Sequence, residues 1–120
     1  SIFLREYSNI QREMVLESVR EAMYPGCVSR KHAIWLCDEK QLSFWKKELG
    51  PDCPDLFKVS VTGEIFKSSD ELLPKREMNI REMSEQAKKY WNPDFSKLTE
   101  EDKIEYLFQG KVKILEKVNL

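Results

Sequence analysis

The sequence lacks a surplus of either charge and lacks long apolar runs. Its 120 residues carry 20 Lys and Arg against 21 Asp and Glu, a formal net charge of −1 with histidine neutral. Binding of DNA or RNA through bulk charge needs a clear basic excess, so the composition argues against a nucleic-acid partner. The charge-free stretches are far shorter than the roughly 20 apolar residues that span a bilayer. We therefore expect no membrane segment.

Cysteine, histidine and glycine are also scarce. The chain has 3 Cys, 1 His and 4 Gly. No CxxC pair occurs, and a closed zinc site needs four ligands, usually in close pairs, so we expect no metal site. The glycines stand far apart, which excludes a glycine-rich phosphate loop. Reduced cysteines and the absence of a basic-then-apolar leader favour a cytoplasmic location.

Large apolar side chains are present in the number that a folded core requires. The sequence has 6 Phe, 4 Tyr and 3 Trp, and 41% of its residues are hydrophobic. This length fits a single domain over residues 1–120. A first residue of Ser1 is compatible with a lost initiator methionine and equally with the C-terminal part of a longer chain.

Hydrophobic periodicity predicts an α+β fold. Apolar steps of three and four indicate helices, and alternation or short apolar runs indicate strands. Helices are predicted over residues 2–24, 39–49 and 80–91, with a helical turn near 70–73, and strands over 32–37 and 56–66. The last twenty residues alternate as two strands or one bent strand. We expect a small mixed or antiparallel sheet of about four strands, packed with the long first helix and two or three further helices.

The first predicted helix has an apolar face that suits two roles. Phe3, Tyr7, Ile10 and Met14 recur at steps of four, three and four. Such a face covers a protein's own sheet or docks on a partner. Residues 2–24 are therefore the candidate surface for a homodimer or another protein.

Two charged residues are candidates for chemistry. Glu105 lies in an alternating run in which Ile104 and Tyr106 point to the opposite side. A partly desolvated carboxylate there could do acid–base or electrostatic work, although a strand with one solvated face shows the same alternation. Arg30, at a strand start, could bind a phosphate or carboxylate through its guanidinium, or remain solvated.

Four segments in matching order resemble domain of unknown function 2441, an uncharacterised bacterial and phage family. They are REAMYPGCVSRKHAIWLCDE, VSVTGEIFKSSDELL, AKKYW and IEYLFQGKVKILEKV. That family is in turn similar to the ADP-ribosyltransferase fold, a split and curved β-sheet with helices that holds NAD in a cleft. The segment that starts at Ser29 resembles the strand that carries a serine or an aromatic residue in that fold.

The resemblance implies roles for three residues. Glu105 would be the catalytic glutamate that hydrogen-bonds the nicotinamide ribose, and Arg30 and Ser29 would lie near the NAD cofactor. The strand that carries the NAD-holding arginine or histidine in that fold has no counterpart ahead of the first helix. Two hypotheses follow: an NAD-binding, ADP-ribosyltransferase-like module, or a non-catalytic domain that docks on a protein through residues 2–24.

Overall fold

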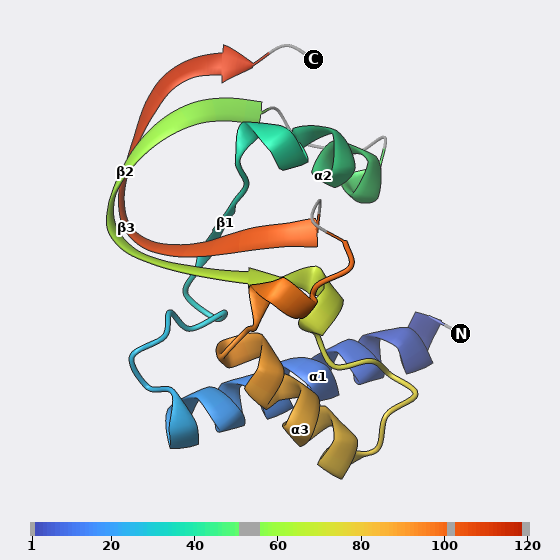
Figure 1. Ribbon diagram of the computed structural model, residues 1–120. Helices are drawn as coiled ribbons and strands as arrows, with labels where there is room; N and C mark the ends of the chain where they lie inside the picture. Colours follow the sequence, from blue (N-terminus) through green and yellow to red (C-terminus); the bar gives the residue numbers. More distant parts are fainter. Residues whose placement is uncertain (1, 51–55, 101–102, 119–120) are drawn as a thin grey trace.

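The computed structural model describes residues 2–50, 56–100 and 103–118, and it has the α+β class that the sequence predicts. Three α-helices, three strands and three short 3-10 turns follow one another in these ranges (Figure 1). They are α1 (Ile2–Met23), β1 (Ile34–Leu36), η1 (Glu39–Gln41), α2 (Leu42–Leu49), β2 (Leu56–Ser69), η2 (Asp70–Leu72), α3 (Ile80–Trp91), η3 (Phe95–Lys97) and β3 (Ile104–Val118). No helix in the described ranges is long and apolar enough to cross a membrane.

The sheet is antiparallel, in the order β1-β3-β2. Residues 104–118 form one continuous strand, so three strands are described where the sequence suggested about four. Gly110 does not turn the chain, because it lies opposite Gly63 in the β2–β3 ladder. A Cβ atom on Gly63 would lie 2.3 Å from the Gln109 carbonyl oxygen, so the two strands approach as closely as they do only with glycine there.

The two faces of the sheet pack against different helices. Figure 1 shows α1 and α3 on one side and α2 on the other. Glu105 and Leu107 pair with Ser68 and Phe66, so these four side chains share a face. The Phe66 ring lies 5.2 Å from the Trp91 ring of α3, which identifies this face as the one turned toward α1 and α3. The predicted alternation of the last strand is therefore confirmed.

The core lies between this face and the two long helices. Its buried members are Leu16, Val19, Val28, Leu73, Ala87, Tyr90, Trp91 and Leu107. Of the predicted face of α1, Ile10 and Met14 are 60% and 64% exposed, so these two residues do not cover the sheet. Helix α3 packs on the neighbouring stripe that contains Leu16 and Val19. The side chains of Phe3 and Tyr7 lie outside the described ones.

Two details of the predicted strands are also corrected. The run 32–37 forms only the short edge strand β1, and Ile34 and Trp35 are about half exposed instead of buried. The register shift between β2 and β3 falls between Lys58 and Val59, and not at Gly63. The part of β2 before Gly63 and the part of β3 after Gly110 curve away from α1 and α3 as a two-stranded ribbon (Figure 1).

Candidate functional site

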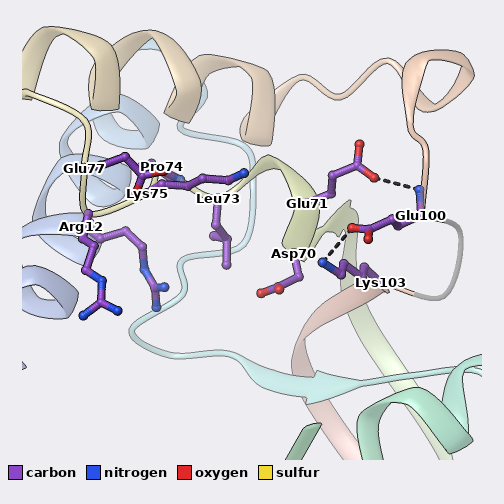
Figure 2. Close-up of a pocket in the computed structure, with 10 residues that line it drawn as sticks. Arg12, Asp70, Glu71, Leu73, Pro74, Lys75, Glu77, Glu100 and Lys103 are labelled. Carbon is purple, nitrogen blue, oxygen red and sulfur yellow. Dashed lines mark hydrogen bonds and ion pairs between the residues drawn. The ribbon is translucent and has the colours of Figure 1, made fainter. Parts of the chain in front are cut away.

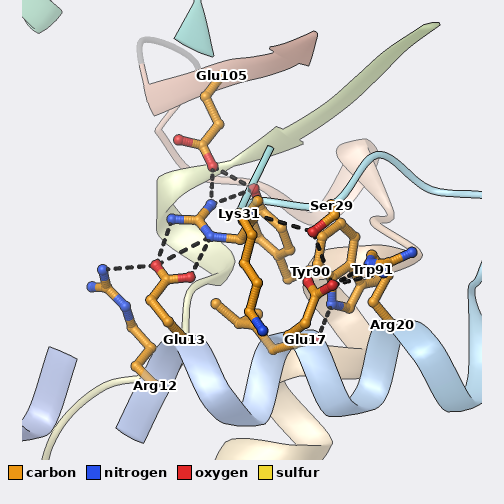
Figure 3. Close-up of polar contacts among 11 residues, drawn as sticks. Arg12, Glu13, Glu17, Arg20, Ser29, Lys31, Tyr90, Trp91 and Glu105 are labelled. Atoms are coloured by element: carbon orange, nitrogen blue, oxygen red, sulfur yellow. Dashed lines mark hydrogen bonds and ion pairs between the residues drawn. The ribbon is translucent and has the colours of Figure 1, made fainter. Parts of the chain in front are cut away.

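The carboxylate of Glu105 is buried. Of the two interpretations of its strand, a desolvated carboxylate or a solvated face, the structure therefore has the first. The residue is only 3% exposed. Its Oε1 atom accepts a hydrogen bond from the Tyr90 hydroxyl and one of 3.0 Å from Arg30 Nη1 (Figure 3). Strand β3 supplies the carboxylate, and α3 supplies Tyr90 from the last turn of its buried face. Glu105 and Arg30, both candidates from sequence, are therefore in direct contact.

Arg30 connects this carboxylate to a second one on α1. Its Nε donates to Glu13 Oε2 at 2.8 Å and its Nη2 donates to Glu13 Oε1 at 2.9 Å. The guanidinium carbon also lies 5.1 Å from the Trp35 ring centroid and 5.3 Å from that of Tyr90, distances at which cation–π attraction operates. We call Glu13, Arg30, Tyr90 and Glu105 the Arg30 cluster.

The environment fixes the protonation of three members of the Arg30 cluster. Burial by itself lowers the pKa of Arg30, but Glu13, Tyr90 and Glu105 raise it above its ordinary value, so the guanidinium stays charged. Burial and the charge of Glu105 raise the pKa of Tyr90 well above 10.0, so its hydroxyl stays a donor. Burial raises the pKa of Glu13, but the hydrogen bonds and charge of Arg30 outweigh it and lower the pKa.

The two oxygens of Glu105 differ in their surroundings. Oε1 has two donors, whereas Oε2 has no hydrogen-bond partner within the described part of the chain. Figure 3 shows this second oxygen of Glu105 pointing away from Tyr90. The geometry thus fixes one side of the carboxylate and leaves the other side able to accept a hydrogen bond.

Ser29, the third candidate from sequence, belongs to a neighbouring group. Its hydroxyl donates to Glu17 Oε1 at 2.8 Å, and Arg20 Nη2 donates to the same oxygen at 2.6 Å. The hydrogen bond from Arg20, opposed by burial and helped by Ser29, lowers the pKa of Glu17. Ser29 is buried, and its side-chain hydrogen bonds in the described structure are with Glu17 and the backbone of Lys31, not with Glu105.

Sequence reasoning missed Glu13 and Tyr90 as members of the site. The sequence pattern places Tyr90 on the apolar face of the helix over residues 80–91 and Glu13 between apolar positions of the first helix, and neither position by itself indicates a site. A signal was present, because Glu13 and Glu17 are one helical turn apart on the same side as Leu16. Two acidic residues bordering a buried stripe require cationic partners, which Arg20 and Arg30 provide.

Three of the surface cavities in the described structure are lined by residues other than Glu105. The first is formed in part by Arg12, which precedes Glu13, and by Lys103, two residues before Glu105. The aromatic surroundings expected of Glu105 are therefore present in Tyr90, but they close around the carboxylate and do not form an open cleft.

Comparison with known proteins adds one finding. A family model described as "Protein of unknown function (DUF2441)" matches residues 1–120. No curated protein matches the sequence.

Proposed function

We propose that this chain, which belongs to the DUF2441 family, is an NAD-binding, ADP-ribosyltransferase-like module with Glu105 as its catalytic carboxylate. The observation that carries the proposal is the asymmetry of that carboxylate. One oxygen is held by Tyr90 and Arg30, and the other points away from Tyr90. Oε2 is the atom that would accept a ribose hydroxyl, and because Glu105 is only 3% exposed the proposal requires that the groups covering this oxygen move aside when NAD binds.

The charge of the Arg30 cluster suits cleavage of a glycosidic bond. Glu105 places a carboxylate beside the Arg30 guanidinium, while Glu13, the second carboxylate of the cluster, is paired with both Arg30 and Arg12. When bound, NAD would supply an N-glycosidic bond whose cleavage leaves positive charge on the ribose. A negative group in a water-poor site stabilises such a charge much more than it would in water.

The remaining cluster residues act on Glu105 and not on phosphates. The guanidinium of Arg30 directs Nε and both terminal nitrogens at Glu13, Tyr90 and Glu105. We therefore give Arg30 and Tyr90 the role of positioning residues, in place of the cofactor contact that the resemblance implies for Arg30. The Ser29 hydroxyl, which donates to Glu17, connects the loop that carries Arg30 to α1.

Titration calorimetry with NAD, together with an assay of nicotinamide release, tests this function. The wild type is expected to bind NAD at millimolar concentration or below. Glu105→Gln keeps the shape and one acceptor oxygen, so it is expected to bind NAD but release nicotinamide about 100-fold more slowly. Glu116→Gln, an exposed glutamate on the same strand, is the matched control and should leave both measurements unchanged. Absence of binding heat at millimolar NAD would rule the function out.

A second function, docking through α1, is favoured by a separate observation. Met14 and Ile80 are 64% and 53% exposed and line one groove between α1 and α3, together with Val15 and Val19. An exposed apolar groove of this kind is typical of a contact between protein molecules. If a second copy covers it, the wild type should sediment as a dimer and Met14→Asp as a folded monomer. A monomeric wild type at high micromolar concentration would exclude this function.

A further inference from the structure

A charged cavity lies beside the Arg30 cluster, and the contacts described so far do not account for the charged residues that line it. Its volume is about 390 Å³, within the range of small-molecule sites. Segments from α1, η2, the connection before α3 and the start of β3 surround it. The residues that matter here are Arg12, Asp70, Lys75, Arg76 and Lys103. We call this cavity the Asp70 pocket.

The Asp70 pocket has charges of both signs on each side, with Glu77 beside Lys75 and Lys103 beside Asp70. Figure 2 shows Arg12 and Lys75 on one side, and Asp70 with Lys103 on the other. Arg76 follows Lys75 directly and also lines the pocket. A ligand that matches this arrangement has an anionic end toward Arg12 and a hydrogen-bond donor toward Asp70.

The acidic side of the pocket leaves one carboxylate unused. Glu71 accepts hydrogen bonds from the backbone N–H groups of Thr99 and Glu100, at 3.1 Å and 2.8 Å. Glu100 in turn pairs with Lys103 at 2.6 Å. The Asp70 carboxylate has no hydrogen-bond partner among the residues that the structure describes, and its burial raises its pKa. An ionised carboxylate only accepts hydrogen bonds, so a ligand that binds beside Asp70 should present a hydrogen-bond donor to it.

The basic side is also short of partners. Arg12 reaches Glu13 at 3.3 Å through one terminal nitrogen, and its Nε is buried without an acceptor in the described structure. Lys75 and Arg76 form no ion pair with any other described residue. Glu77 also lines the cavity, but Arg12, Lys75 and Arg76 together outnumber it on this side and can bind a phosphate group.

We propose that the Asp70 pocket binds a phosphate monoester of a small polyhydroxylated molecule, such as a sugar phosphate. The phosphate contacts Arg12, Lys75 and Arg76, and a hydroxyl group donates to Asp70. The site is separate from the proposed chemistry of Glu105, which does not line the pocket. Each part of the ligand satisfies groups that otherwise lack a partner.

Titration calorimetry with ribose 5-phosphate, inorganic phosphate and ribose as probes tests this site. The wild type should bind ribose 5-phosphate more tightly than either fragment. Arg76→Gln lies at an exposed position, so the fold should survive, and binding of both phosphate probes should weaken about tenfold. Asp70→Ala should remove the preference for ribose 5-phosphate over inorganic phosphate. Lys97→Gln, an exposed cation away from the pocket, is the matched control.

Two results would overturn the site: no heat with ribose 5-phosphate at millimolar concentration, or equal weakening by Lys97→Gln and Arg76→Gln. Circular dichroism and the melting temperature of each variant show whether the fold is kept. Glu105→Gln should bind ribose 5-phosphate as the wild type does. Failure of the Asp70 pocket and failure of the NAD chemistry are therefore distinguishable.

Discussion

Replacing Arg30 with methionine should be among the most damaging single changes in this chain. Methionine has a similar length and no charge, so Arg30→Met removes the hydrogen bonds to Glu13, Tyr90 and Glu105 while it keeps most of the packing. The two carboxylates are affected differently. The Glu13 side chain is 40% exposed and can return to water, whereas that of Glu105 is 4% exposed and cannot.

The expected cost comes mainly from Glu105. Removing one partner of a buried ion pair costs about 3–5 kcal/mol, because the remaining charge is left without compensation. A domain of this size is stable by only about 5–15 kcal/mol, so the variant should lose a large fraction of its free energy of unfolding. Adding Glu105→Leu to Arg30→Met removes the orphaned charge and should restore much of the loss.

Urea unfolding followed by tryptophan fluorescence measures this difference, since Trp91 is buried against the cluster. The double-mutant cycle of Arg30→Met and Glu105→Leu gives the coupling between the two side chains. Lys88→Met, which breaks an exposed ion pair with Glu85 on α3, serves as control and should change little. A loss below about 1 kcal/mol for Arg30→Met, the size of a surface pair, would refute the view that this cluster is desolvated.

Three further changes test other parts of the structure. Because the folded pKa of Glu13 is lowered, its contribution to stability is present above its ordinary pKa of 4.5 and is lost as pH falls through the folded pKa. Stability of Glu13→Gln measured by urea unfolding from pH 7 to 3 should therefore fall less steeply than that of the wild type, and parallel curves would contradict this. Gly63→Ala places a Cβ atom against the Gln109 carbonyl and should lower the free energy of unfolding by about 1–3 kcal/mol. Gly26→Ala, with open space around it, is the control and should cost nothing measurable. Equal melting temperatures of the two variants would disprove the close approach. Asn79→Ala removes the capping box of α3 and should cost about 1 kcal/mol in the same unfolding assay, and an unchanged midpoint would argue against the cap.

Local patterns predicted most of the fold. The Asn79 cap and the apolar spacing of residues 80–91 define α3, and alternation from Ile104 onward defines the inner half of β3. These signals lie within one or two turns of the chain or a few strand residues, which is the range over which periodicity is informative. The local pattern left open whether the chain turns at Gly110 or continues as one bent strand, because the continuous strand depends on Gly63 opposite to it.

The candidate site was predicted only in part, for the same reason. Alternation identified Glu105 as a carboxylate on the face opposite Ile104, and its position after an aromatic-rich strand suggested desolvation. Nothing local connects Arg30 to Glu105, which lie 75 positions apart, or to Glu13 on α1. Such pairings depend on how helices and strands pack, which a single sequence does not specify.

The wide separation of the cluster residues along the chain also bears on how the protein folds. Arg30 contacts partners 17, 60 and 75 positions away, so closing these loops requires that α1, α3 and β3 have already met. Contacts of such high sequence separation form late and slow the search for the native topology. During that search the charged members remain hydrated, and their dehydration becomes favourable only as the last loop closes. The ion pairs would then stabilise the native topology after it has formed. They should slow unfolding more than they speed folding.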